Sequence, residues 1–199
     1  MVQVQSAIDT MEIINAIAVI YDRDPDHSVK VTGFALSIFD KLGPIHHYGP
    51  EERRLLEMAS RLHDIGYTQA GQKPHNKTSR DLILNMDIPG ISESDKVIFA
   101  LIARYHTGEL PDADEHRHFS ELSDDRREVV EWLSGILRVA DALDCKHLNI
   151  IKDIDINVAD QEIILALDAD GNCRKQIKRA REKEELLVKM TGKDIKYRC

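Results

Sequence analysis

Hydrophobic positions in the first two thirds of the chain recur at the three- and four-residue spacing of amphipathic helices. This pattern predicts helices over about 13–21, 25–43, 50–64, 75–88, 92–105 and 124–143. Asp24, Pro25 and Ser92 are typical of helix N-termini, because they cap free backbone N–H groups or need none. The polar stretch 107–122 contains glycine and proline and predicts a loop.

After about residue 150 the hydrophobic period changes from that of a helix to that of a strand. Two alternating runs follow one another: Ile154, Ile156 and Val158, then Ile163, Leu165 and Leu167. Residues 159–162 form the expected hairpin turn, a charged helix follows over about 173–190, and Ile195 and Tyr197 predict a last short strand. We therefore expect a mainly α fold with two parts, a helical domain over 1–149 and a small α+β appendage over 150–199.

The charge balance excludes one class of partner. The 199 residues include 27 Lys and Arg against 35 Asp and Glu, which gives a formal net charge of −8. Binding to duplex DNA needs a basic face, so DNA is not an expected partner. The longest apolar stretch, 16–21, is far too short to cross a membrane.

Cysteine usage and the first residues bear on location. Cys145, Cys173 and Cys199 are odd in number and widely spaced, so we expect no disulfide framework. The opening MVQVQSAID lacks the basic start and apolar run of a signal peptide. A cytoplasmic protein is the resulting expectation, and a homodimer is the default oligomer.

The strongest chemical signal is His63-Asp64, followed by Gly66, at the end of a predicted apolar helix. Adjacent helical side chains point about 100° apart, so the pair reaches one ion only where the helix ends. A glycine there permits that change of direction. Imidazole nitrogen with carboxylate oxygen suits a divalent metal. The alternative is a capped helix end with a hydrogen-bonded core histidine.

Two more polar groups fall on apolar helix faces. His27 lies one turn before Val31, and Asp141 lies four residues after Leu137. An inward aspartate is costly unless it is paired or bound to a metal. Three separate helices thus each bring a metal-competent group to a buried face, which is how helical bundles build metal sites.

The ordered set His27, His63-Asp64 and Asp141 resembles the H…HD…D signature of the HD superfamily of metal-dependent phosphohydrolases. Within that superfamily the chain is similar to the C-terminal HD domain of the exopolyphosphatase/guanosine pentaphosphatase family. The matching stretches are 55–67, 75–83, 103–108 and 136–144, and the strand-rich tail is similar as well. That family carries an actin-like phosphatase domain before the HD part, and we find none here, so its activities are not carried over.

The resemblance implies an HD-domain helical bundle that holds a divalent metal. The candidates for this metal are Mn, Ni, Fe, Mg, Co and Zn. The resemblance implies His27, His63, Asp64 and Asp141 as metal ligands, with Asp64 and Asp141 at the catalytic centre. Asp64 would be the bridging ligand if two ions bind.

There are four substrate-binding candidates, two from the resemblance and two from helical spacing. His75 and His106 match histidines that line the pocket in related domains; each would bind substrate phosphate or a second ion, and a solvated surface position is the alternative for His75. Lys30 and Arg138 lie one helical turn from His27 and Asp141, so they are candidates to contact the leaving phosphate. The alternative for both is a surface cation or a structural ion pair.

Two other features predict surface structure. His46-His47, between two prolines, predicts an exposed loop. The basic run from Arg174 to Arg181 is followed by acidic residues at i,i+4 spacing and predicts a solvated, salt-bridged helix. A weak polyanion-binding face is the alternative for that run.

The sequence therefore predicts a metal-dependent phosphohydrolase that acts on a nucleotide or another small phosphorylated molecule through metal-activated water. The main alternative is a regulatory module that binds a nucleotide or polyphosphate without efficient turnover. A purely structural helical scaffold is the third, and the complete set of four ligands argues against it.

Overall fold

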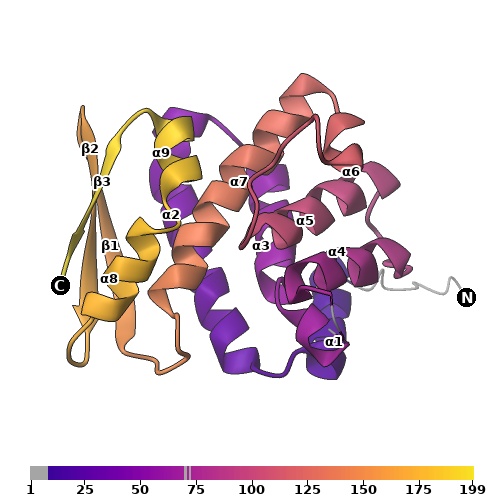
Figure 1. Ribbon diagram of the computed structural model, residues 1–199, viewed down its shortest axis with the longest axis horizontal. Helices are drawn as coiled ribbons and strands as arrows, with labels where there is room; N and C mark the ends of the chain where they lie inside the picture. Colours follow the sequence, from indigo (N-terminus) through magenta and orange to yellow (C-terminus); the bar gives the residue numbers. More distant parts are fainter. Residues whose placement is uncertain (1–8, 70, 72) are drawn as a thin grey trace, which may run out of the picture.

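The computed structural model describes residues 9–69, 71 and 73–199. The opening residues 1–8, where no signal peptide is expected, lie outside the described residues. The elements are α1 (Thr10–Tyr21), α2 (Pro25–His46), α3 (Pro50–Leu62), η1 (Ile65–Thr68), α4 (His75–Asn85), α5 (Glu93–Tyr105), α6 (Arg117–Ser120), α7 (Asp124–Leu143), β1 (Ile151–Val158), β2 (Glu162–Ala169), α8 (Arg174–Arg181), α9 (Glu185–Thr191) and β3 (Asp194–Arg198). The fold is mainly α with a small sheet (Figure 1).

The predicted helix starts are confirmed by their caps. The Asp24 side chain accepts a hydrogen bond from the backbone N–H of His27, and Pro25 occupies the first helical position of α2. The Ser92 side chain accepts from the backbone N–H of Asp95 at the start of α5. These caps satisfy donors that the helix itself leaves free.

The helix α2 does not end at Gly43 as predicted but continues through Pro44 to His46. The prediction that His46 is an exposed loop residue is wrong. Its Nε2 lies 2.9 Å from the Phe39 carbonyl, and its ring packs edge-on against Trp132 of α7. The chain leaves the helix at His47, which has a left-handed backbone with φ of 59°.

The helix α7 is the centre of the molecule. It packs against α2, α3 and α5 and, through another face, against α8 and α9. Figure 1 shows it running between the earlier helices and the C-terminal elements. Val130 and residues 132–140 on this helix are buried, including Leu133 and Leu137 at helical spacing. Within the described ranges, none of the helices has the length and apolar composition that crossing a bilayer requires.

The C-terminal elements form a small sheet with strand order β1-β2-β3 in the described part of the chain. The predicted hairpin is confirmed, because β1 and β2 pair antiparallel with Ile156 opposite Leu165. The last strand, β3, pairs parallel to β2, with Leu165 opposite Tyr197. Side chains from Ile14 to Tyr197 belong to one hydrophobic core, so the boundary between 149 and 150 stays a prediction.

Three details differ from the predictions. The helix expected over 173–190 is two helices, α8 and α9, because the chain breaks at 182–184 and turns Lys183 inward. The loop 107–122 contains the one-turn helix α6, whose Phe119 is buried. Cys173 and Cys199 are joined by a disulfide, because β3 returns the chain to the start of α8.

Candidate metal centre

The local structure at 63–66 explains how His63 and Asp64 reach the same point. The last α-helical residue of α3 is Leu62, and Asp64 leaves the helical conformation with φ of −106° and ψ of 4°. Gly66 then allows α4 to approach closely, because an added Cβ would lie 2.1 Å from the His75 carbonyl oxygen and 2.6 Å from the Ser79 nitrogen. The end of α3 and the start of α4 therefore meet at Asp64.

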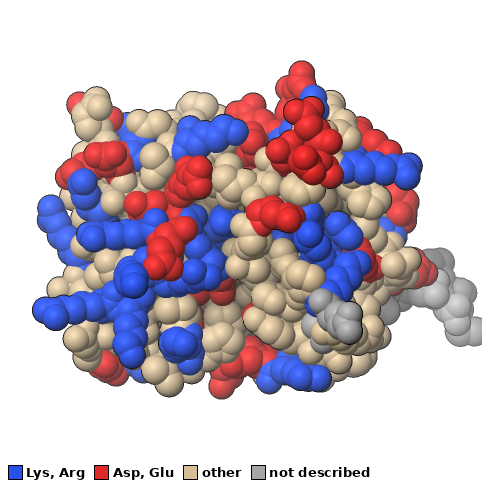
Figure 2. Space-filling view, viewed as in Figure 1, with Lys and Arg blue, Asp and Glu red and all other residues tan. Residues whose placement is uncertain are grey.

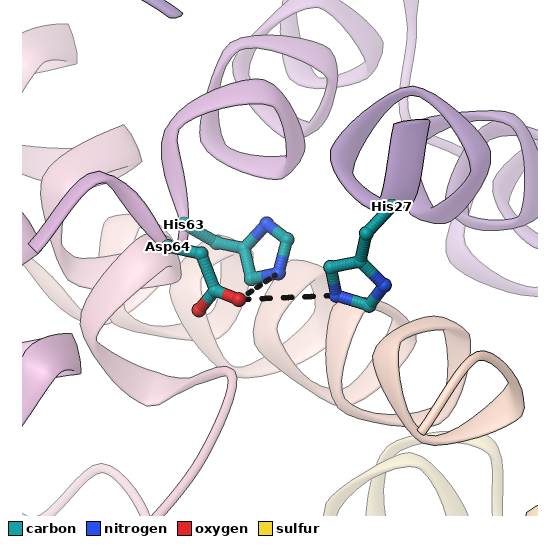
Figure 3. A group of neighbouring side chains, drawn as sticks. All are labelled: His27, His63 and Asp64. Atoms are coloured by element: carbon teal, nitrogen blue, oxygen red, sulfur yellow. Dashed lines mark ion pairs between the residues drawn. The ribbon is translucent and has the colours of Figure 1, made fainter. Parts of the chain in front are cut away.

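Side chains from three segments far apart in the sequence converge here. His27 comes from the first turn of α2, His63 and Asp64 follow α3, and Asp141 comes from the last turn of α7. His27 Nε2 lies 3.8 Å from Asp64 Oδ2, and His63 Nε2 lies 3.5 Å from the same oxygen. Figure 3 shows the two rings and the carboxylate pointing toward one another.

Asp141 stands beside this group. Its Oδ1 lies 3.4 Å from His27 Nε2 and 4.0 Å from His63 Nε2. Its other oxygen, Oδ2, accepts a hydrogen bond of 2.6 Å from Lys183 Nζ. The structure thus brings the four predicted ligands together, with one oxygen of Asp141 held by the lysine.

The rings are held by contacts on their outer sides. His63 Nδ1 donates to the Ser60 carbonyl at 2.7 Å, and His106 Nδ1 donates to the Ala103 carbonyl at 2.6 Å. A carbonyl can only accept, so each ring has its proton on Nδ1 and, when neutral, a lone pair on Nε2. His27 Nδ1 lies 2.9 Å from Asp144 Oδ2, an arrangement that orients metal-binding histidines in many proteins.

The inward atoms lack partners. Among the described residues, His27 Nε2, His63 Nε2 and Asp64 Oδ1 are buried and make no hydrogen bond. Such unsatisfied buried atoms are rare and costly in native proteins. A cation bound at about 2.0–2.3 Å places neighbouring ligand atoms about 3–4 Å apart, and the distances given above match this spacing. The donor set of imidazole and carboxylate fits a divalent metal.

A second group shares Asp64 with the first. Asp64 Oδ1 lies 3.4 Å from His75 Nε2 and 3.3 Å from His106 Nε2, and the two nitrogens are 3.2 Å apart. In the described part of the chain, both groups, His27-His63-Asp64 and Asp64-His75-His106, have ligand atoms within 4.8 Å of one another. One carboxylate therefore faces two potential ion positions, one from each oxygen.

The histidines respond differently to the carboxylates around them. Burial lowers the pKa of His27, but Asp141 and Asp144 outweigh burial and raise this pKa to about 10. Burial also lowers the pKa of His75, to about 4, and the neighbouring His106 adds to that effect. His75 is therefore neutral at pH 7 and offers a lone pair rather than a positive charge.

The carboxylates stay ionised despite their burial. Burial raises the pKa of Asp64, but the neighbouring His63 and His106 outweigh it and hold this pKa below its ordinary value. Burial likewise raises the pKa of Asp141, and Lys183 is the largest of the groups that bring this pKa well below the ordinary value. Both carboxylates thus carry the negative charge that metal binding needs.

A cavity of about 610 Å³ opens above these groups, which is the size of a small-molecule site. Its lining residues are Asp64, Tyr67, His75, His106, Thr107, Asp141, Cys145, Lys146, His147, Lys175, Lys178, Arg179, Glu182 and Lys183. The metal-competent side chains form one side, and α8 with the turn after it forms the other. Figure 2 shows Lys and Arg gathered over α8 beside the hollow.

The basic run of α8 therefore has more than the surface role predicted for it. One expected i,i+4 salt bridge is present, since Lys178 lies 4.0 Å from Glu182, and Arg179 lies 3.0 Å from the same carboxylate. The same lysine and arginine also line the cavity. The sequence reasoning missed Lys183, whose side chain is 6% exposed, because a single helix over 173–190 gives it no special position.

The two basic candidates for phosphate contacts, Lys30 and Arg138, both have partners within the protein. Lys30 Nζ donates to Asn149 Oδ1 at 2.5 Å and lies 3.4 Å from Asp144 Oδ1. Arg138 donates to the backbone carbonyls of Tyr105 at 2.8 Å and Gly108 at 3.3 Å. Neither side chain lines the cavity, because each reaches nearer acceptors first. Lys30 steadies Asp144, and Arg138 ties the end of α5 to α7.

The sequence reasoning also missed the outer support of His27. Asp144 and His147 lie just after α7; Asp144 is the last residue of the matching stretch 136–144, but nothing there indicated a contact with His27. The ring of His147 stacks on that of His27 at 3.8 Å, and its Nδ1 lies 2.6 Å from Asp24 Oδ2. The ring of Tyr67 stacks on His75 at 4.0 Å in the same way.

Comparison with known proteins places the chain in a family. Residues 11–187 match the family described as Ppx/GppA phosphatase, domain III. A guanosine-5'-triphosphate,3'-diphosphate pyrophosphatase of Vibrio vulnificus (strain YJ016) is 26% identical over 151 residues, which are 75% of this chain and 29% of that protein. The chain therefore spans less than a third of that relative. With a match over most of its length, the chain belongs to the Ppx/GppA phosphatase domain III family.

Proposed function

We propose that this protein is an HD-type, metal-dependent phosphohydrolase that cleaves a phosphoanhydride bond in a nucleotide or another small phosphorylated molecule. The observation that carries the proposal is the set of buried, unpartnered atoms at the centre, namely His27 Nε2, His63 Nε2 and Asp64 Oδ1. The Vibrio relative is a pyrophosphatase of a guanosine nucleotide, which supports the substrate class.

In this proposal His27, His63, Asp64 and Asp141 hold a first divalent ion. His75 and His106, with the second oxygen of Asp64, hold another ion or contact the substrate phosphate directly. A bound divalent ion supplies an acidic water and neutralises phosphoryl oxygens. Mn, Ni, Fe, Mg, Co and Zn all remain open, because the donor set of nitrogen and oxygen atoms accepts each of them.

The chain's own residues keep this centre in order. Asp144 fixes the ring of His27 from behind at 2.9 Å. Lys183 holds Oδ2 of Asp141 at 2.6 Å, which leaves Oδ1 directed at His27. Burial of His27 and His63 excludes competing water from their nitrogens.

A regulatory module that binds a nucleotide or polyphosphate without efficient turnover is the second candidate. The ion pair between Lys183 and Asp141 favours it, because a protein cation already neutralises one of the expected metal ligands. Under this alternative the cavity binds its ligand through the cations of α8 and leaves it intact.

The deciding experiment measures bound metal and hydrolysis in the same preparations. The protein is loaded with Mn²⁺ or Ni²⁺, and GTP, guanosine tetraphosphate and a general phosphodiester are offered as substrates. The variant Asp64→Asn removes the shared ligand, and we expect at least about a thousandfold loss of hydrolysis together with loss of metal.

The matched control is Asp40→Asn, an exposed aspartate on α2 that pairs with Arg53 and makes the same change in charge outside the cavity. We expect wild-type metal content and activity for this control. Wild-type protein without bound metal, or an Asp64→Asn variant that hydrolyses as fast as wild type, contradicts the enzyme. Tight GTP binding without turnover supports the regulatory module instead.

A further inference from the structure

A second cavity lies between α4, the C-terminal half of α5 and the short helix α6. Its volume is about 390 Å³, and the residues that the structure describes around it differ from those that line the cavity at the metal centre. The charged residues of its lining are four cations and two acids, namely Lys77, Arg80, Arg104, Arg117, Glu109 and Glu115. The rings of Tyr105 and Phe119 also line it. This hollow is therefore separate from the candidate metal centre.

A buried guanidinium at this cavity is only partly used by the protein. The side chain of Arg104 is 4% exposed, and its Nη2 donates to Glu109 Oε2 at 3.2 Å. Its Nη1 is buried and has no hydrogen-bond partner among the described residues. An arginine presents five N–H donors, and a buried charged donor without an acceptor is costly. One end of this guanidinium is therefore available to an acceptor from outside the chain.

Tyr105 places a second unused donor beside the first. The residue is fully buried, and its hydroxyl makes no hydrogen bond within the described part of the chain. Buried tyrosine hydroxyls usually have a partner. The Arg104 guanidinium lies 4.9 Å from the centre of the Tyr105 ring, so the two residues are neighbours in space as well as in sequence. Two buried donors without partners thus line one cavity.

The only acid that pairs with these groups, among the described residues, is on a loop. Glu109 Oε2 lies 3.1 Å from Lys77 Nζ, 3.2 Å from Arg104 Nη2 and 3.5 Å from His116 Nε2. Its side chain is 58% exposed, and exposed ion pairs of this kind contribute little stability. The Glu109 carboxylate therefore marks a place where an anionic oxygen binds, and a ligand can compete with it there.

The cavity and the metal centre use the same two segments of the chain. His75 lines the metal-centre cavity and Lys77 lines this one, while His106 and Arg104 divide in the same way at the end of α5. Asn76 joins the two segments, because its Nδ2 donates to the Arg104 carbonyl at 2.7 Å. A ligand in this cavity would therefore contact the segments that carry His75 and His106.

We propose that this cavity is a second ligand site, which binds a phosphate group, free or as a small ester, through Arg104, Tyr105 and Lys77. A phosphate has enough acceptor oxygens for the guanidinium, the hydroxyl and the ammonium together, whereas a carboxylate has two. Arginine and lysine are the side chains that proteins use to bind phosphate. The volume of about 390 Å³ also has room for a small organic group on the phosphate. This inference does not depend on the proposed function.

The test titrates the ¹⁵N-labelled full chain with sodium phosphate and follows the Arg104 Nε–H signal by NMR. EDTA removes metal ions, and sodium chloride keeps the ionic strength constant so that general screening does not change. In wild type the Arg104 signal should shift to saturation. Tyr105→Phe should lose about tenfold in phosphate affinity without loss of Tm, because no described protein group uses this hydroxyl. Tyr48→Phe makes the same change outside the cavity and should bind phosphate as wild type does.

Charge variants should change the phosphate affinity in opposite directions. Lys77→Gln should lose about tenfold, because a charge-assisted hydrogen bond is removed. Glu109→Gln should bind phosphate several-fold more tightly, because the competing carboxylate is gone. Lys41→Gln and Glu93→Gln make the same changes in charge at exposed positions outside the cavity, and each should alter the affinity by less than about twofold.

Two further probes identify the ligand. Tighter binding of glycerol phosphate than of inorganic phosphate assigns an ester, and equal or weaker binding assigns free phosphate. Acetate should bind at least about tenfold more weakly than phosphate. Three results overturn the proposal: no shift of the Arg104 signal in wild type, equal affinity for acetate and phosphate, or wild-type phosphate affinity in both Tyr105→Phe and Glu109→Gln.

Discussion

The two sides of the cavity are built in opposite ways. On the metal-competent side, His27 and His63 are buried and Asp64 is half-buried, and each ring has a partner behind it that fixes its orientation. On the other side, Lys175 and Lys178 are exposed and have long, flexible side chains. A metal ion tolerates little variation in ligand distance, whereas a phosphate chain is bound by charges that adjust to it.

The two sides of the cavity should also respond differently to salt. Exposed charges are screened by salt over about 8–10 Å at moderate ionic strength, and buried ligand atoms are screened much less. Changes in the helical bundle should therefore affect the metal centre, and changes in α8 should affect only the attraction of anions. Four substitutions test this division, taken from the largest expected effect to the smallest.

Gly66→Ala should break the metal-competent side. The added Cβ would lie 2.1 Å from the His75 carbonyl oxygen, so α4 must move away from the end of α3. We expect a loss of about 3 kcal/mol in the free energy of unfolding, or about 6–12 °C in Tm, together with weaker metal binding. Thermal unfolding checks this, with Gly43→Ala as control because nothing lies within 4 Å of its Cβ. A Gly66→Ala protein as stable as that control contradicts the packing described.

Asp144→Asn should weaken the metal centre without changing the fold. It removes the carboxylate behind His27, and such outer partners are worth about 10–100-fold in metal affinity. Titration with Mn²⁺ measures this, and Asp26→Asn is the control because that exposed aspartate is one residue from His27. The same loss of affinity in both variants would show that net charge, not orientation of the ring, is responsible.

Gly135→Ala should disturb the opposite side. Its Cβ would lie 3.1 Å from the Leu187 nitrogen, so α9 must shift on α7 and carry α8 with it. We expect a loss of about 1–2 kcal/mol in the free energy of unfolding and a several-fold loss in tripolyphosphate affinity, with metal affinity retained. Gly33→Ala is the control, since its Cβ has open space. If metal affinity and tripolyphosphate affinity fall together in Gly135→Ala, the two sides of the cavity are not independent.

Lys30→Gln should have the smallest effect. The lysine supports Asp144 at 3.4 Å and does not line the cavity. We expect at most about a fivefold fall in metal affinity and unchanged affinity for tripolyphosphate. A larger loss of affinity for tripolyphosphate than for Mn²⁺, measured by calorimetry, would support the phosphate contact of Lys30 that the sequence predicts.

The predictions from sequence succeeded where the information is local. Helical phase placed His27 and Asp141 on inward faces, and the glycine after His63-Asp64 marked the end of α3. Helical phase also places Arg138 one turn from Asp141. It does not show that the backbone carbonyls at the end of α5 lie within reach of the Arg138 guanidinium and bind it there.

The remainder depends on contacts between distant segments. The break before Lys183 carries no glycine or proline, so nothing in the local sequence marks it. Cys173 and Cys199 meet only because β3 joins the sheet, and α8 reaches the cavity only because α7 packs against it. These arrangements follow from tertiary packing, which no periodic pattern reports.

The parallel pairing of β2 and β3 gives the C-terminal elements a further property. Two neighbouring parallel strands need a connection that crosses over, and α8 with α9 is that connection. Its two ends are anchored by hydrogen bonds in the sheet, while its outward side chains have no role in that anchoring. The crossover is therefore fixed to the sheet at both ends, and substitutions of its outward side chains should leave the pairing of β2 with β3 intact.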